Sequence, residues 1–194
     1  CRRLAVLDAI VCPEWELRYF SFDRRWDAAA AQRLGSMRDG CVDEWFAVFQ
    51  GSSVFLRGFA HEAPLRNPPG LFDGVPDALA ALVTEPAFGD DATFCVWNTG
   101  DGWRRGAHAI PEPSDGTEDD PDGSARLLAI LVDDPIAWKH HADGYHELDV
   151  PLGPVARVYR DEPLTPELVA AIAPEATLAA LADDLDEIGW PIAP

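Results

Sequence analysis

The chain has 194 residues, and its 34 acidic against 15 Lys or Arg side chains give a formal net charge of −19 at pH 7. This length is typical of one domain, and 47% hydrophobic residues can supply a core without a metal or disulfide. The negative charge repels phosphate backbones and anionic lipids, so we expect no nucleic-acid binding and no membrane binding. A basic protein partner, a cationic ligand and simple solubility remain as interpretations of the charge.

The cysteines and the first residues of the chain indicate a cytoplasmic protein. Cys1, Cys12, Cys41 and Cys95 are scattered without any CxxC spacing, which excludes zinc-ribbon and thioredoxin-like motifs. We therefore expect buried free thiols in a reducing compartment. The first apolar run is short and is interrupted by Asp8, unlike a signal peptide or a membrane span.

The first third of the chain contains one helix pattern and several strand patterns. Leu and Ile recur at helical spacing over 4–11, and Pro13 ends this helix. The other elements expected before residue 61 are a strand over 15–22, a short helix over 28–34 capped by Asp27, a turn at 37–40, and strands over 42–49 and 54–60.

The rest of the chain becomes increasingly helical. The stretch 111–123 is acidic and rich in Pro and Gly, so we expect a flexible loop there, the only candidate boundary. The elements expected around it are a helix after Pro76, strands over 93–97 and from Trp103, helices from Ser124 and Asp134, a strand over 155–159, and helices after Thr165 and up to Gly189. The sequence predicts a single α+β domain over 1–194: an antiparallel sheet built around a central hairpin (about 42–60), with helices mainly C-terminal.

The central hairpin has a register that follows from its turn. Gly51 and Ser52 can form a two-residue turn, so residues at equal distances from it face each other. Trp45 then faces Gly58, with a bulky indole over a bare glycine, and the outermost pair is Val42 with His61. A slip of one residue would exchange the two faces.

The other face of the hairpin holds the candidate catalytic residues. Glu44 lies diagonally between Arg57 and His61 in this register, at a distance that long side chains can span. Glu44 and His61 could form a carboxylate–imidazole pair with Arg57 as an anion clamp, or all three could form a charge-balanced structural patch. The structural interpretation is preferred. Candidate binding residues gather at the open end of the hairpin: Arg38, Asp39, Asp43 and Glu62.

Other polar clusters give no metal site and no cofactor site. His140 and His141 are adjacent on an expected helix and point about 100° apart, and Gly144 interrupts that helix before His146. Metal binding by this cluster is therefore not expected, because a zinc site needs three convergent ligands. The acidic residues of 118–123 resemble the start of a calcium loop, but Ala129 stands where a bidentate Glu is needed.

Four segments carry a resemblance to a known family. They are WELRYFSFDRRW from Trp15, SMRDG from Ser36, DEWF from Asp43 and GFAHE from Gly58. The pattern SMRxGxxDExF with GFxHE resembles a family of uncharacterised bacterial proteins with no established activity. The resemblance implies a soluble, intracellular bacterial protein and supplies no catalytic residues. That family has a small Ser-Gly-type pair where this chain has Cys41 and Val42.

Two hypotheses for function come from different classes. The preferred one is a non-enzymatic binding or inhibitor protein, immunity-like, for a basic protein partner, because the chain is acidic and lacks familiar catalytic motifs. The alternative is a small-molecule hydrolase or acid–base enzyme that uses the Glu44, Arg57 and His61 patch, which requires a pocket on that face of the hairpin.

Overall fold

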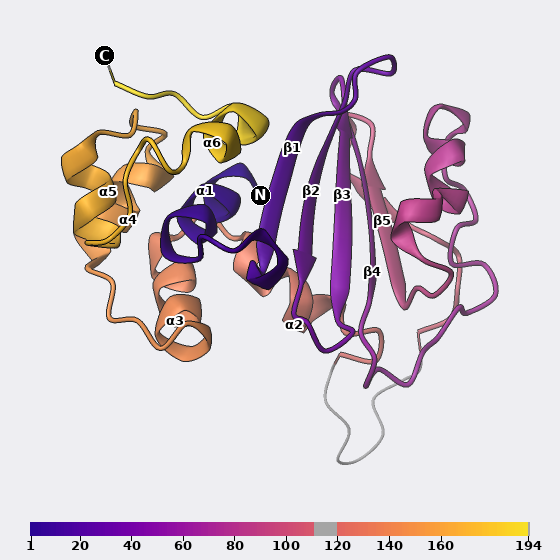
Figure 1. Cartoon of the computed structure of the whole chain (residues 1–194). Coiled ribbons are helices and arrows are strands. Elements are labelled where there is room, and N and C mark those ends of the chain that lie inside the picture. Colours follow the sequence, from indigo (N-terminus) through magenta and orange to yellow (C-terminus); the bar gives the residue numbers. More distant parts are fainter. Residues whose placement is uncertain (111–119, 194) are drawn as a thin grey trace. The chain divides into compact units, whose positions relative to one another are not determined.

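The computed structural model describes residues 1–110 and 120–193 and confirms the α+β fold (Figure 1). A six-stranded antiparallel sheet has its strands in sequence order, β1 to β6. The chain divides into two compact units: a helical unit of Cys1–Arg25 with Ile130–Pro194, and a sheet unit of Trp26–Ala129. Strand β1 (Phe20–Asp27) begins in the helical unit and ends in the sheet unit.

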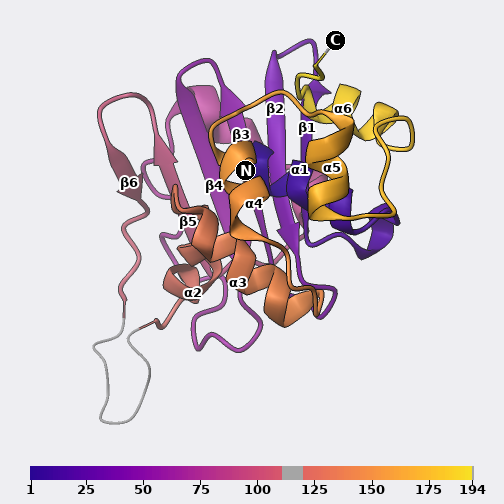
Figure 2. The ribbon, with the colours of Figure 1, turned by 90° about the vertical axis from the view of Figure 1, so that its left-hand side faces the viewer.

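The sheet unit contains the predicted central hairpin. Strands β3 (Glu44–Gln50) and β4 (Ser53–Phe59) pair with Trp45 opposite Gly58, so the register is confirmed. Gly51 has φ +58°, as a two-residue hairpin turn requires at its first position. The hairpin lies between β2 (Gln32–Arg38) and β5 (Phe94–Asn98), and Figure 2 shows β6 (Trp103–Arg105) beyond β5.

Gly58 lies on the middle one of three paired strands, where a side chain has no room. A Cβ atom on Gly58 would lie 2.2 Å from Cζ of Phe94 and 2.8 Å from the carbonyl oxygen of Glu44. Phe94 is the partner of Gly58 on β5, as Trp45 is on β3. The bare backbone therefore leaves room for the ring of Phe94, whereas the sequence predicted such room for the indole of Trp45.

One face of the sheet packs against short 3₁₀ helices of the same unit. Helix η2 (Asp77–Thr84) and helix η3 (Pro86–Phe88) supply Leu79, Leu82 and Phe88 to a buried cluster with Phe46, Val48, Phe55, Cys95 and Trp97. The ring of Phe88 stacks between those of Trp26 and Phe46. The opposite face of β3 is also buried, including Trp45 and Ala47, which explains why this strand reads as an almost continuous apolar run.

The helical unit is built around α1 (Arg2–Val11), whose residues from Leu4 to Ile10 are all buried. Helix α1 contacts α4 (Leu152–Tyr159), α5 (Pro166–Ile172) and α6 (Ala182–Ile188), and α3 (Pro135–Tyr145) packs on α4. The predicted ends are confirmed: Asp134 and Thr165 accept N–H groups at the starts of α3 and α5, and Gly189 ends α6 in the left-handed conformation.

Four predicted elements differ from the structure, one of them the turn at 37–40, whose first two residues belong to β2. The strand over 15–22 begins only at Phe20, after a 3₁₀ turn (Trp15–Leu17). Asp27 accepts the N–H groups of Ala29 and Ala30, but the helix over 28–34 is a turn that leads into β2, because Gln32–Arg38 pairs with β3. The strand over 155–159 is the end of α4, since its buried Val155, Val158 and Tyr159 follow helical spacing.

Two smaller expectations also change. Strand β3 begins at Glu44 and β4 ends at Phe59, so the predicted pair of Val42 with His61 does not form. Among the four free thiols only Cys95 is buried, where burial raises its pKa to about 12, whereas Cys41 is exposed. Cys95 is therefore an inert thiol of the core.

The acidic stretch 111–123 lies mostly outside the described residues, and the expectation of a flexible loop and of one domain stays a prediction. Its last four residues are described and lead into α2 (Ser124–Leu128). Among the residues that the structure describes, no helix is both long and apolar enough to span a membrane.

Candidate functional site

The three candidate catalytic residues of the hairpin do not form one group. Arg57 is only 3% exposed, and its guanidinium donates to the carbonyl oxygens of Val83 at 3.3 Å, Gly89 at 3.3 Å and Asp91 at 2.8 Å. Burial lowers the pKa of this guanidinium. Arg57 thus holds the segment after η2 onto the sheet, and its donors are engaged by the backbone instead of facing an anion.

Glu44 remains near Arg57 but is not linked to His61. It is half-buried, and burial raises its pKa, which the charges of Arg38 and Arg57 partly offset. Arg38 is exposed, with its guanidinium 5.3 Å from the ring centre of Phe46. Glu44, Arg38 and Arg57 therefore form one electrostatic group on the strands, and His61 belongs to another.

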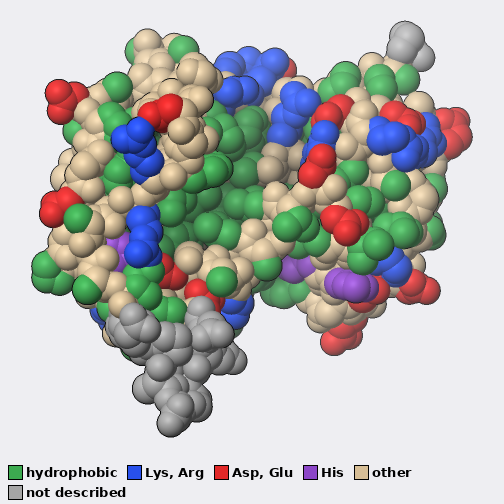
Figure 3. Space-filling model, turned by 180° about the vertical axis from the view of Figure 1, so that it is seen from behind, with side chains coloured by type: hydrophobic (Ala, Val, Ile, Leu, Met, Phe, Trp, Pro, Cys, Tyr) green, Lys and Arg blue, Asp and Glu red, His purple; other side chains and the backbone are tan. Residues whose placement is uncertain are grey.

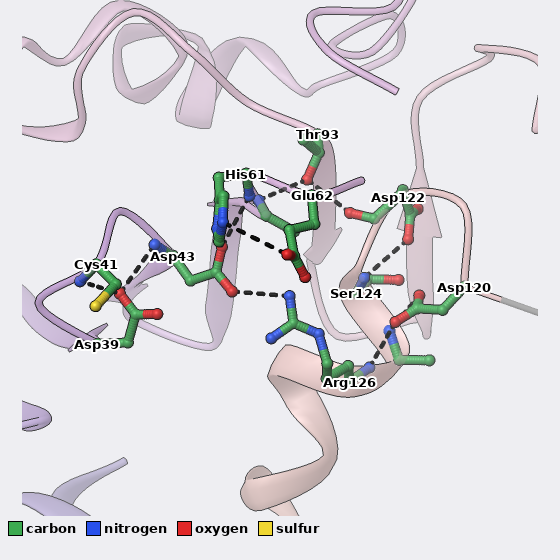
Figure 4. A network of polar contacts seen from close by, with 12 residues as sticks. Asp39, Cys41, Asp43, His61, Glu62, Thr93, Asp120, Asp122, Ser124 and Arg126 are labelled. Atoms are coloured by element: carbon green, nitrogen blue, oxygen red, sulfur yellow. Dashed lines mark hydrogen bonds and ion pairs between the residues drawn. The ribbon is translucent and has the colours of Figure 1, made fainter. Parts of the chain in front are cut away.

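The second group is a network centred on the buried side chain of Asp43 (Figure 4). Its Oδ1 accepts hydrogen bonds from the backbone N–H and from the ring Nδ1 of His61, both at 2.8 Å. Its Oδ2 accepts from Nη2 of Arg126 at 2.7 Å. Asp43 is 3% exposed, so one buried carboxylate joins the segment just before β3, the second residue after β4 and helix α2.

The loop before β3 is shaped by Asp39. Its Oδ1 accepts the backbone N–H groups of Cys41 at 2.7 Å and Asp43 at 3.0 Å, and its own N–H donates to the carbonyl of Asp43. Val42 has φ +111° within this loop, a conformation that L residues with branched side chains rarely adopt.

Helix α2 brings Arg126 to the network because acidic side chains fix its first turn. Asp120 accepts the N–H groups of Ala125 and Arg126, and Asp122 accepts that of Ser124. A Cβ atom on Gly123, which has φ +75°, would lie 2.2 Å from Cβ of Ala60. This close approach places the start of the helix against the residue that precedes His61.

Thr93 completes the attachment of α2 to the sheet. Its hydroxyl donates to the carbonyl of Asp122 at 2.6 Å and accepts the backbone N–H of Ala60 at 3.1 Å. The hydroxyl is buried, so both of its hydrogen bonds are shielded from water. The positions of His61 and Arg126 are therefore set by the same short bridge.

The Asp43 network shifts the pKa values of Asp43 and His61 in opposite directions. Burial tends to raise the pKa of Asp43, but the hydrogen bonds from His61 and Arg126 outweigh it, and the pKa lies below its ordinary value. The hydrogen bond to Asp43 raises the pKa of His61, to which the charges of Asp43, Glu62 and Asp39 add. The His61 side chain is 44% exposed, and its Nε2 lies 3.9 Å from Oε1 of Glu62. This is an oriented imidazole whose second nitrogen is accessible, which suits proton transfer.

The structure thus brings together four of the seven residues that the sequence singled out: Asp39, Asp43, His61 and Glu62. It adds Arg126, which sequence reasoning missed. Arg126 lies in a helix that was expected, but 83 residues separate it from Asp43, and no local pattern indicates their contact.

A second charged feature lies in the helical unit. An open recess of about 520 Å³ is lined by Asp23, Arg25, Asp183, Asp186 and Glu187. Asp186 pairs with both Arg24 and Arg25. Partial burial raises the pKa of Glu187, and the charges of Asp23 and Asp184 raise it further. The recess therefore carries negative charge that its own arginines do not balance.

Comparisons with protein-family models, with curated proteins and with solved structures each return no match. The resemblance to an uncharacterised bacterial family stays a prediction.

Proposed function

We propose that the chain is a non-enzymatic binding or inhibitor protein, immunity-like, for a basic protein partner. The observation that carries this proposal is the acidic recess at α6, where the pKa of Glu187 is raised by burial and by neighbouring carboxylates. A lysine or arginine of a partner in this recess would relieve the repulsion that raises this pKa. The electrostatics of such a site favour a cation independently of shape complementarity.

The overall charge supports fast association with a basic partner. A net charge of −19 attracts a positively charged protein over distances set by the ionic strength, which raises the association rate at low salt. On the face shown in Figure 3, acidic side chains are spread over the surface with basic side chains among them. Long-range attraction thus comes from the whole molecule, whereas the recess would select the orientation.

The test uses basic proteins encoded by genes adjacent to the gene for this chain. Each purified candidate is titrated against the chain, with dissociation constants measured at two salt concentrations. The double variant Asp183→Lys with Glu187→Lys is compared with Glu175→Lys with Asp90→Lys, which changes net charge equally at exposed sites outside the recess. We expect affinity to fall at least about tenfold more in the recess variant, which corresponds to about 1.4 kcal/mol. Equal losses, or no binding by any basic candidate at low salt, would contradict the proposal.

A second candidate function is acid–base catalysis, which one observation supports. The Asp43–His61 pair orients an imidazole through Nδ1 and leaves Nε2 exposed, as general bases are commonly held. This version of the enzyme hypothesis replaces Glu44 by Asp43 and does without Arg57. A screen of ester, amide and phosphoester substrates with the wild-type chain and His61→Gln tests it. Turnover that His61→Gln abolishes supports catalysis, and turnover that this variant retains excludes the dyad.

A further inference from the structure

A buried polar cluster in the helical unit takes no part in either proposal. It consists of Asp8 in the middle of α1, His141 in α3 and His146 at the end of α3. One potential ligand atom from each residue lies within 4.8 Å of the others. Asp8 is the only charged residue among the buried positions of α1, and it is 0% exposed.

The carboxylate of Asp8 is held in one orientation by three donors. Its Oδ2 accepts the backbone N–H groups of Tyr19 and Phe20, both at 2.9 Å, and its Oδ1 accepts Nε1 of Trp138 at 3.3 Å. Each carboxylate oxygen can accept more than one bond, so Oδ1 keeps capacity on the side of the histidines. Outer hydrogen bonds of this kind position metal-binding carboxylates in proteins.

The two imidazoles are the observation that points to a ligand. Nε2 of His141 and Nε2 of His146 are buried, and neither has a hydrogen-bond partner within the parts of the chain that the structure describes. The His146 side chain is 10% exposed, and its Nε2 lies 3.6 Å from Oδ1 of Asp8, which is too long for a hydrogen bond. Buried polar atoms are almost always satisfied, so two such nitrogens beside one carboxylate require an explanation.

Aromatic rings surround the cluster. His141 stacks on Tyr145 with ring centres 5.3 Å apart and meets the edges of Tyr19 and His146 at 4.6 and 5.7 Å. Burial lowers the pKa of His141, a shift that the charge of His146 reinforces and that of Asp8 opposes. A neutral imidazole in an apolar surrounding is the form that ligates metal ions.

We propose that Asp8, His141 and His146 bind one divalent transition-metal ion of the zinc type. Two imidazoles and one carboxylate are a common ligand set for zinc, and three protein ligands leave a coordination position for water or a substrate. Ligand atoms of a tetrahedral zinc site lie roughly 3.4 Å apart, so small side-chain rotations would close the observed spacing. The sequence argument against a metal considered His140 with His141. The structure takes only His141 from that pair and adds Asp8 from α1.

An ion pair between Asp8 and a protonated His146 is the simplest competing explanation. It would satisfy only one of the two imidazoles, because His141 would keep a buried Nε2 without a partner among the described residues. A metal ion satisfies both imidazoles and the free capacity of Asp8 at once.

The experiment uses the full chain without an affinity tag, stripped of metal with a chelator. Zinc binding is measured by competition with a chromophoric chelator, and Co²⁺ serves as the spectroscopic probe. The variants are His141→Ala and His146→Ala, and the matched control is His140→Ala, which changes the exposed neighbouring histidine of the same helix. Circular dichroism verifies the fold of each variant.

We expect the wild-type chain and His140→Ala to bind one equivalent of zinc, and either cluster variant to lose at least about tenfold in affinity. The Co²⁺ complex should show visible ligand-field bands without a thiolate charge-transfer band. That spectrum keeps the test decisive if a variant fails to fold, because the wild type alone reports nitrogen and oxygen ligands. A thiolate band would assign the metal to cysteine and overturn the proposal. Absence of stoichiometric binding, or equal binding by folded cluster variants, would overturn it as well.

Discussion

Asp43 in the sheet unit and Asp8 in the helical unit are both buried, and their carboxylates are satisfied in different ways. Asp43 of the sheet unit accepts from a backbone N–H, an imidazole and the guanidinium of Arg126. Asp8 of the helical unit accepts from two backbone N–H groups and an indole, and it faces two imidazoles without forming a hydrogen bond to either. The charge of Asp43 thus has a fixed cation beside it. The two imidazoles near Asp8 can place a positive charge beside its carboxylate only if they are protonated or bind a metal ion.

The largest expected effect is a loss of stability that is greater when Asp8 is replaced than when Asp43 is replaced. Asp8→Ala leaves the N–H groups of Tyr19 and Phe20 and the indole of Trp138 without an acceptor in the interior, which should destabilise the protein by about 4 kcal/mol. Asp43→Ala should cost about 2 kcal/mol, because Arg126 is half-exposed and can be hydrated. Urea unfolding in metal-free buffer measures both. An equal or greater loss in Asp43→Ala would remove the contrast.

A second variant tests how the cation of the Asp43 network is held. Gly123→Ala introduces a Cβ atom 2.2 Å from Cβ of Ala60 at a residue with φ +75°. The start of α2 must then move, and Arg126 with it, for a loss of about 2 kcal/mol. Because both changes weaken the same contact with Asp43, Gly123→Ala and Arg126→Ala should be less than additive in a double-mutant cycle of unfolding free energies. Full additivity would show that α2 and Asp43 are independent.

These two sites show what the sequence could predict. The hairpin register was predictable because a two-residue turn and strict alternation are local signals, and it placed Trp45 opposite Gly58. The prediction of a helix over 28–34 was wrong. Asp27 does accept a backbone N–H of the residues that follow, but pairing of Gln32–Arg38 with β3 outweighs that local preference. The prediction of a strand over 155–159, where α4 ends, was wrong because a short apolar run fits a helix as well as a strand.

The contacts that define the two sites could not be predicted from short stretches of sequence, because they join residues far apart in the chain. Asp39, Asp43, His61 and Glu62 were named because they flank one hairpin, whereas Arg126 comes from a helix far along the chain. Asp8 was noted only as an interruption of an apolar run, although a single acid on a buried helix is itself a signal of a polar partner in the core. The identity of that partner depends on tertiary packing.

A smaller change addresses strain in the loop that positions Asp43. Val42 has φ +111° and is 63% exposed, so its side chain gains little from burial. Val42→Gly relieves the backbone strain and should stabilise the protein by about 1 kcal/mol, after the greater freedom of glycine in the unfolded chain is counted. Val42→Ala is the matched control, since it removes the branched side chain but keeps a Cβ atom. Equal stabilisation by both variants would assign the effect to the exposed side chain instead of the backbone.

The dependence of stability on pH contrasts the two sites most directly, because their histidines shift in opposite directions. The hydrogen bond to Asp43 raises the pKa of His61 above 6.5, so its stabilising contribution is complete below pH 6.5 and is lost as the pH rises through the folded value. Burial lowers the pKa of His141 below 6.5, so its contribution is present above pH 6.5 and is lost as the pH falls through the folded value.

Unfolding free energies measured across this range for His61→Gln and His141→Ala, each relative to the wild type, should therefore have slopes of opposite sign. Zinc should enlarge the His141 effect at the higher pH, because metal ligation also requires neutral imidazoles, and should leave the His61 effect unchanged. Slopes of the same sign would mean that Asp8 favours the protonated form of His141 as Asp43 favours that of His61, and the difference between Asp8 and Asp43 would disappear.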